Sequence, residues 1–305
     1  MSFISIIIPV FDEEKNIVPF YNEIKKYLSS TDELIFIDDG STDNTFLEIQ
    51  QLSKVNNTIK CISLSRNFGH QNALMAGLQY ANGDFIITMD GDLQHPASLI
   101  PVMLEKLKEG FDIVITKRIK TKNEGVLKNI FSKIFYRFIN YISDTRIEPN
   151  SSDFRAFNKK VLSNILLFKE RELFLRGIFS WIGFKTATIS FEAASRRFGK
   201  TKYSFGKMAK LAVRGITSFS FKPLRIAILT GSIISLAAFT FGIFALVSYY
   251  KGTTVPGWAS TIIAIMFLGG TQLLAIGLLG EYIASLFIES KNRPLFLIDK
   301  KINID

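Results

Sequence analysis

The chain has 305 residues, a net charge of +10 and 48% hydrophobic residues. One hydrophobic core usually stops growing at roughly 250–300 residues, so a single soluble domain of this length would lie at the upper limit. A basic chain can bind nucleic acid, but here the basic residues cluster beside apolar segments, which favours membrane lipid as partner and no nucleic acid. The single cysteine, Cys61, excludes an intrachain disulfide, as expected for a cytoplasmic domain.

Short apolar strands alternate with amphipathic helices in the first third of the chain. Strands are predicted at 4–10, 33–43 (with a polar end), 59–65, 84–90 and 112–118, and helices at 16–30, 44–55, 70–81 and 96–110. Strict alternation of this kind predicts a mostly parallel sheet with helices on both faces, an α/β fold. Ligands of such sheets bind beyond the carboxyl ends of the strands.

Polar clusters stand at four of these strand ends. The clusters comprise Asp12, Glu13 and Glu14; Asp38, Asp39, Gly40, Ser41 and Asp43; Arg66, Asn67 and Gly69; and Asp90, Asp92 and Gln94. Each alone is typical of a turn or a helix cap. Three acidic clusters at one sheet edge would repel each other unless a cation lay among them. Asp90 and Asp92 can both face one hard cation, and Gln94 can add a carbonyl oxygen, so Mg²⁺ or Mn²⁺ is predicted as cofactor.

Two basic amphipathic segments follow the alternating region. The first covers 127–142 and the second lies within 203–225. Each is compatible with an ordinary helix packed on a core. Because apolar spans follow directly, we favour helices in the lipid headgroup layer, with 203–225 as a juxtamembrane helix.

The chain carries no charged residue from 226 to 250 and from 252 to 280, which predicts membrane spans at 226–250 and 258–287. A buried hairpin of soluble core helices is the alternative. Basic residues flank both spans, and the loop at 251–257 carries one lysine, so the positive-inside rule places the N-terminal region and the tail at 288–305 in the cytoplasm. The first residues lack a basic region and predict no signal peptide. The expected location is the inner, cytoplasmic membrane.

Several motifs together resemble a known family. "PVFDEE", "IDDGSTD", "RNFGHQNA" and "DGDLQHP" are similar to motifs of family 2 glycosyltransferases of the GT-A fold. "SSDFRAF", "FLRGIFSW" and "RRFGKTKYS" resemble the branch that glycosylates polyprenyl phosphates, related to dolichol-phosphate mannose synthases. The two spans match its bacterial bactoprenol glucosyltransferases. The resemblance implies a GT-A domain over 1–202.

The resemblance also implies residue roles. The nucleotide sugar would be bound by Pro9, Asp12, Glu14, Asp39, Arg66 and Asp90, with Asp38 and Asp43 supporting the loop. Metal would be held by Asp90, Asp92 and Gln94. Catalysis would involve Asp153, Asp92 and Arg155. Lipid phosphate and diphosphate would be received by Arg118, Arg197 and Lys202. His70 and His95 receive no role.

The implied activity is inverting transfer of glucose from UDP-glucose onto undecaprenyl phosphate, giving a β-linked lipid sugar for O-antigen or teichoic acid modification. A lipid phosphate is already charged, so Asp153 would orient the reactants or act as a weak base. UDP-GlcNAc, GDP-mannose and a UDP-aminoarabinose derivative remain alternative donors, and an inactive nucleotide-sugar-binding scaffold is the alternative class. A processive synthase is disfavoured because a Q-x-x-R-W motif is missing, and a dehydrogenase because a glycine fingerprint is missing. A homo-oligomer and a downstream flippase are expected partners.

Overall fold

The computed structural model describes residues 3–119, 151–171, 174–192, 221–253 and 257–304. The predicted interface helix at 127–142, most of the juxtamembrane segment, and Arg197 and Lys202 lie outside the described residues. The described chain forms two units. Of these described residues, one unit contains 3–119, 151–171, 174–192 and 293–304, and the other contains 221–253 and 257–292.

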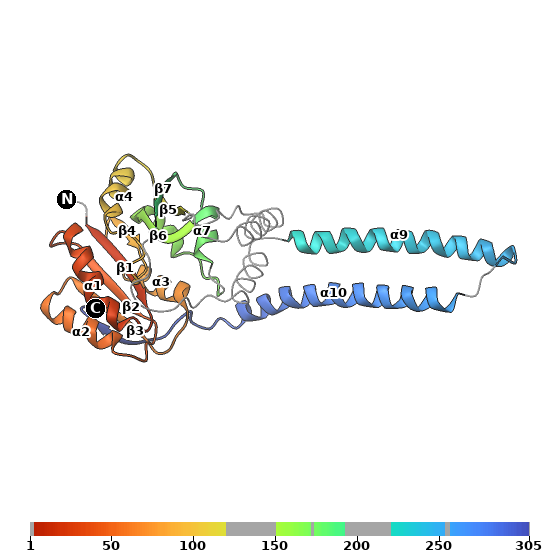
Figure 1. Ribbon diagram of the computed structural model, residues 1–305, viewed down its shortest axis with the longest axis horizontal. Helices are drawn as coiled ribbons and strands as arrows, with labels where there is room; N and C mark the ends of the chain where they lie inside the picture. The colour runs from red at the N-terminus through yellow and green to blue at the C-terminus, as the bar shows by residue number, and fades with distance from the viewer. Residues whose placement is uncertain (1–2, 120–150, 172–173, 193–220, 254–256, 305) are drawn as a thin grey trace. The chain divides into compact units, whose positions relative to one another are not determined.

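An eight-stranded sheet organises the first unit (Figure 1). Its order is β7-β5-β6-β4-β1-β2-β3-β8. The strands are β1 (Ile4–Val10), β2 (Glu33–Asp38), β3 (Ile59–Leu64), β4 (Phe85–Thr88), β5 (Ile113–Ile119), β6 (Ser151–Asn158), β7 (Thr186–Glu192) and β8 (Ile298–Ile302). The helices are α1 (Glu14–Ile24), the 3₁₀ turn η1 (Lys25–Tyr27), α2 (Thr45–Val55), α3 (His70–Gln79), α4 (Leu99–Lys108), α6 (Lys159–Ile165) and α7 (Leu175–Trp181).

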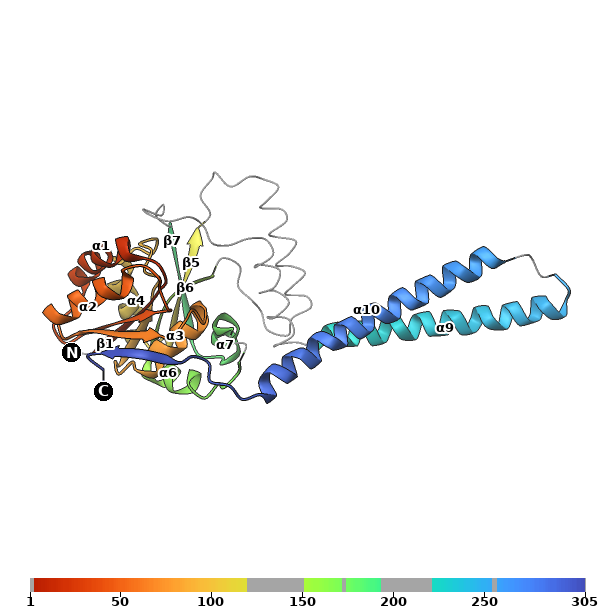
Figure 2. The ribbon, with the colours of Figure 1, turned by 90° about the horizontal axis from the view of Figure 1, so that it is seen from below.

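Strands β1 to β4 pair with one another in parallel, β1 with β2 and β4 and β2 with β3, which confirms the predicted mostly parallel α/β sheet. Two antiparallel strands were not predicted. Strand β6 inserts between β4 and β5. Strand β8, from the segment predicted only as a tail, pairs with β3 at the sheet edge and is the blue arrow in Figure 2. The insertion of β6 matters for function because it brings the residues around Asp153 beside the carboxyl end of β4.

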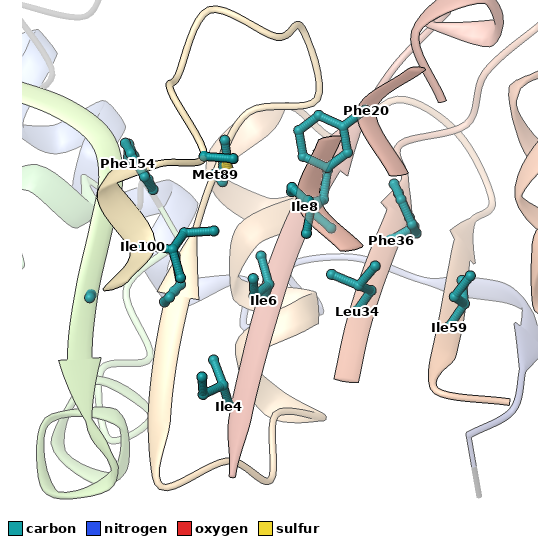
Figure 3. Packing of buried hydrophobic residues seen from close by; sticks show 14 of the residues in the cluster. Ile4, Ile6, Ile8, Phe20, Leu34, Phe36, Ile59, Met89, Ile100 and Phe154 are labelled. Atoms are coloured by element: carbon teal, nitrogen blue, oxygen red, sulfur yellow. The ribbon is translucent and has the colours of Figure 1, made fainter. Parts of the chain in front are cut away.

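Alternating side chains of β1 pack against opposite helical layers. Ile4, Ile6 and Ile8 point into a core that includes residues of α1, α2 and α4 (Figure 3). Ile7 points to the other face, where α3 approaches so closely that a Cβ on Gly77 would clash with the Ile7 side chain. Burial of each such side chain contributes about 1.5–3 kcal/mol to the stability of the fold and so holds the helices on both faces of the sheet. The polar loops follow at the strand ends.

The second unit consists of two long apolar helices, α9 (Lys222–Tyr250) and α10 (Trp258–Ser290). Helix α9 begins at Lys222, within the segment expected to precede the span. Both helices are long and apolar enough to cross a bilayer, whose hydrocarbon core is about 30 Å thick. Their apolar windows are not buried within the structure, in contrast to a soluble core hairpin. They are therefore candidate membrane-spanning helices.

Candidate active site

The first two polar clusters are bound to each other by hydrogen bonds. The Asp12 amide donates to Ser41 Oγ at 3.0 Å, and Asp12 Oδ1 accepts the Thr42 amide at 2.8 Å. Asp12 holds a left-handed backbone conformation, with φ of 51°. Glu14 Oε2 accepts the Asn44 amide at 3.2 Å. The loops after β1 and β2 therefore form one connected wall at the sheet edge.

Asp39 joins the second cluster to the third. Its Oδ1 accepts the Phe68 amide at 2.7 Å and its Oδ2 accepts the Gly69 amide at 2.9 Å. Burial raises the pKa of Asp39, and the two amide hydrogen bonds partly offset this rise. Only 3% of the residue is exposed. Asp39 thus fixes the loop that carries Arg66 and presents little surface of its own.

Gly40 allows these two loops to meet. Its φ is +69°, and a Cβ at this position would lie 2.7 Å from Arg66 Cα and 2.8 Å from the Asn67 nitrogen. We expect Gly40→Ala to lower the free energy of unfolding by about 1–3 kcal/mol, because backbone atoms cannot give way, and to weaken nucleotide binding. Chemical denaturation measures this.

Gly110→Ala is the matched control for that variant. Gly110 also has a positive φ, of +91°, but a Cβ there would meet nothing within 4 Å. Gly110→Ala therefore measures the loss in free energy of unfolding that the left-handed backbone alone causes. Equal destabilisation by the two substitutions would contradict the close approach of the loops.

Asp90, at the end of β4, is paired with a histidine from α3. His70 Nε2 lies 2.8 Å from Asp90 Oδ1. Burial alone would lower the pKa of His70, but the hydrogen bond and charge of Asp90 outweigh it and raise the pKa to about 9. Burial likewise opposes ionisation of Asp90, and the His70 hydrogen bond reverses this and lowers the pKa of Asp90. The pair is therefore an ionised carboxylate facing an imidazolium at neutral pH.

The His70–Asp90 pair predicts a pH-dependent stability of the metal-free protein. The pKa of His70 is raised from 6.5 to about 9, so the stabilisation is complete below pH 6.5 and is lost as pH rises through 9. His70 is 37% exposed, and solvent screening limits the loss to about 1 kcal/mol. Thermal unfolding in EDTA between pH 6 and 10 measures it. His70→Gln should lack this slope; an unchanged slope in that variant would assign it to another group.

Asp92 lies deeper than Asp90. It is 8% exposed, and its Oδ1 accepts the Gln94 amide at 3.1 Å. Gly91 packs so tightly that a Cβ would lie 2.7 Å from Val10 Cγ1, and Leu93 adopts a positive φ of 61°. This turn fixes both carboxylates at the end of β4.

Asp90, Asp92 and Gln94 lie in the turn after β4 and carry side-chain oxygens, the ligand type that Mg²⁺ and Mn²⁺ prefer. Asp90 is ionised and 35% exposed, and it already attracts a cationic side chain in His70. Among the described residues, His, Cys, Asp and Glu form no cluster of three or more with metal-binding geometry. A six-coordinate cation at these residues would take its remaining ligands from a substrate or water.

Asp153, on β6, is held by two arginines. Arg176 Nε donates to Oδ1 at 2.9 Å and Arg176 Nη2 donates to Oδ2 at 2.7 Å, and Arg155 Nη2 lies 3.8 Å from Oδ1. Burial opposes ionisation of Asp153, but the charge and hydrogen bonds of Arg176 prevail and hold its pKa well below the usual range. Asp153 is a fixed carboxylate and a poor proton acceptor near neutral pH.

Arg155 lies buried beside Asp153. It is 2% exposed, its Nε donates to the Ser152 carbonyl at 3.1 Å, and its guanidinium lies 4.7 Å from the centre of the Phe179 ring. Burial lowers the pKa of Arg155 to about 10. These contacts place Arg155 behind Asp153, as part of its support.

Two consecutive residues of α3, His70 and Gln71, connect Asp90 to the helix that holds Asp153. His70 contacts Asp90, and Gln71 Oε1 accepts the Leu175 amide at 3.1 Å at the start of α7. The next residue of α7, Arg176, holds Asp153. The two carboxylates are thereby connected through two helices.

The other predicted residues lie at varied depths. Pro9 is buried in β1, and Arg118 is exposed at the end of β5. Arg66 is exposed, with its guanidinium 4.2 Å from the centre of the Phe68 ring. The described part of the chain thus places exposed cations on two loops or strand ends of this edge.

Sequence reasoning missed three residues of the site. The chain contains two histidines, and both approach Asp90: His70 at 2.8 Å and His95 Nε2 at 3.7 Å from Oδ2. Arg176 lies in "FLRGIFSW", a segment that the resemblance included without assigning a role to the arginine. The sequence offered one indication of these residues, which is the position of His95 only five residues after Asp90.

Comparison with known proteins points to one family. The model of the Glycosyl transferase family 2 matches residues 5–166. A prophage bactoprenol glucosyl transferase homolog of Escherichia coli (strain K12) is 42% identical over 301 residues, which cover 97% of this chain and 98% of that protein. The bactoprenol glucosyl transferase of Shigella phage SfII is 40% identical over 301 residues, with 97% of each chain covered.

A solved structure supports the fold. A mannosyltransferase from Pyrobaculum calidifontis, in complex with GDP-Man and Mn²⁺, superposes with a TM-score of 0.50 at 16% identity, over 93% of this chain and 86% of that chain. At this identity the likeness concerns the fold alone, a GT-A-like sheet with C-terminal helices. The family match and the full-length relatives establish more: the chain belongs to glycosyl transferase family 2.

Proposed function

We propose that the protein transfers glucose from UDP-glucose to undecaprenyl (bactoprenol) phosphate. The observation that carries this proposal is that two ionised carboxylates, Asp90 and Asp153, lie at the same sheet edge. The same chain has two candidate membrane helices. The relatives named bactoprenol glucosyl transferases, which match over their full length, support the choice of sugar and acceptor.

On the donor side, the wall formed by Asp12, Glu14 and the Asp39 loop would receive the nucleotide, with Arg66 near the phosphates. Asp90, Asp92 and Gln94 would hold Mg²⁺ or Mn²⁺. A divalent cation bound there neutralises charge on the departing diphosphate. The chain's contribution is a turn after β4 that keeps both carboxylates in place.

On the acceptor side, no general base is required. A phosphate monoester has a second pKa near 6, so its oxygen is already anionic at neutral pH. That oxygen attacks the anomeric carbon, the bond from this carbon to the UDP oxygen breaks, and UDP leaves on the opposite side. The α-configured donor therefore gives a β-linked lipid sugar.

Asp153 would orient the sugar or the acceptor, because its low pKa and its bidentate partner Arg176 oppose a role as base. Arg155 would support it. Arg118, with Arg197 and Lys202, would receive phosphate charge and offset the repulsion between diphosphate and lipid phosphate.

The setting proposed for this reaction is the cytoplasmic face of the inner membrane. The catalytic domain (1–202) would lie in the cytoplasm, the amphipathic segments at 127–142 and 203–225 at the headgroups, and the spans at 226–250 and 258–287 in the bilayer. A homo-oligomer is proposed, and a flippase would carry the lipid sugar across for glycan modification.

A donor panel tests the proposal. Purified full-length protein is incubated with undecaprenyl phosphate and radiolabelled UDP-glucose, UDP-GlcNAc or GDP-mannose, with and without EDTA. We expect label in the lipid phase from UDP-glucose, loss of transfer in EDTA, and recovery with Mg²⁺ or Mn²⁺. Transfer from another donor would replace glucose as the proposed sugar. Transfer that continues in EDTA would contradict the proposed metal requirement. A failure of every donor would favour a nucleotide-sugar-binding scaffold.

A further inference from the structure

His95 is enclosed between two aromatic rings. The residue is 8% exposed. Its imidazole stacks on Phe154 with ring centres 5.1 Å apart and planes inclined by 19°, and it meets the edge of Phe191 at 5.8 Å. These contacts fix the plane of the imidazole, so each ring nitrogen has a set direction. The enclosed ring offers a substrate little exposed surface.

The partners of the two nitrogens assign the tautomer of His95. Nδ1 lies 3.2 Å from the Asp90 amide, and Nε2 lies 2.7 Å from Ser152 Oγ. An amide can only donate, so Nδ1 is the acceptor and the ring hydrogen is on Nε2, which donates to Ser152. The same Oγ accepts the Phe154 amide at 3.2 Å.

The hydrogen bonds of His95 act where the sheet pairing stops. The register between β4 and β6 runs from Phe85 with Asn158 to Thr88 with Arg155. Asp90 and Ser152 lie beyond that last pair. The imidazole therefore connects the backbone of Asp90 to the residue next to Asp153, after the end of the backbone ladder. Thr88 Oγ1, which donates to the Asp153 carbonyl at 2.6 Å, makes the adjoining link.

We propose that His95 is a positioning residue that sets the separation between Asp90 on the donor side and Asp153 on the acceptor side. This inference rests on the proposed sugar transfer. In-line attack requires the reacting atoms within about 3–3.5 Å of each other, and a displacement of about 1 Å can cost 100-fold in rate. The tie through His95 opposes such a displacement.

Three substitutions separate the two hydrogen bonds of His95. His95→Asn keeps an acceptor near Nδ1, His95→Gln keeps a donor near Nε2, and His95→Phe keeps only the ring contacts. We expect His95→Phe to lower kcat about 10- to 100-fold, as for other residues that orient a site, with the KM for UDP-glucose within about threefold. The Asn and Gln variants should retain intermediate activity.

Ser152→Ala provides a double-mutant cycle. Both Ser152→Ala and His95→Asn remove the Nε2–Oγ hydrogen bond, so the combined variant should lose less than the product of the two single losses. Strict multiplication of the two losses, or a kcat of His95→Phe within twofold of wild type, would overturn the proposal. If His95→Phe does not fold, the double-mutant cycle of Ser152→Ala and His95→Asn still tests the proposal.

Hydrogen exchange gives a readout that does not depend on turnover. The Asp90 amide should exchange faster in His95→Phe and in His95→Gln than in wild type, and no faster in His95→Asn. Unchanged exchange in His95→Phe would also overturn the proposal. Wild-type protein that transfers no sugar would instead overturn the proposed function, and the exchange result would still decide whether His95 holds Asp90.

Discussion

Asp153→Asn is expected to lower kcat about 100- to 1,000-fold while the KM for UDP-glucose stays within about threefold. The substitution keeps the shape of the side chain and removes the charge that Arg176 holds at 2.7 and 2.9 Å. Asp153 lies on β6, and β4 separates this strand from β1 and β2, whose loops are proposed to bind the nucleotide. The substitution should therefore affect the orientation of the reactants and not donor affinity. Steady-state kinetics with varied UDP-glucose measures both constants.

The same substitution leaves arginine charge without its carboxylate, which also destabilises the fold. Arg176→Lys is the control, because it keeps a positive charge and removes the bidentate contact. We expect equal thermal stability of Asp153→Asn and Arg176→Lys, with a larger loss of kcat in Asp153→Asn. A large rise in KM for UDP-glucose in Asp153→Asn would move Asp153 to the donor side.

Asp92→Asn is expected to reduce transfer at least about 100-fold, because a neutral amide is a poor ligand for a divalent cation that stabilises the leaving diphosphate. The amide oxygen can still accept the Gln94 amide, so the turn should persist. Isothermal titration with Mn²⁺ and UDP should show weaker binding together with the loss of rate.

Asp38→Asn is the matched control for Asp92→Asn. Asp38 is also a buried carboxylate at a strand end, 2% exposed, but its oxygens accept the Ser41 amide at 3.0 Å and Ser63 Oγ at 2.9 Å. Its substitution should lower stability and leave Mn²⁺ affinity near wild type. Undiminished Mn²⁺ affinity in Asp92→Asn would contradict the proposed ligand set.

Strands β1 to β5 were predictable because each is an apolar run with a polar end, and burial on both faces of a parallel sheet requires that pattern. Strand β6 was not, since "SSDFRAFN" mixes charged, polar and apolar residues. Its place between β4 and β5 depends on tertiary pairing. Strand β8, "IDKKI", is short, charged and at an edge, where the residues need not be apolar.

The convergence of the polar clusters was also predictable, because parallel strands bring their carboxyl ends to one edge. Contacts between loops were not. Spacing alone does not show that Asp39 binds the amides of Phe68 and Gly69, or that Arg176 from α7 reaches Asp153. Such contacts depend on loop conformations that the linear pattern does not encode, and they explain why neither histidine was assigned a role.

Analysis of the lipid product shows directly whether glucose is transferred to the lipid phosphate. Purified protein is supplied with undecaprenyl phosphate and UDP-glucose. The lipid product is examined by mass spectrometry and by NMR, in which the coupling constant of the anomeric proton reports the linkage. We expect undecaprenyl phosphate that carries one glucose in β linkage through its phosphate. Free glucose with unmodified lipid phosphate, or an α-linked product, would contradict the proposed transfer.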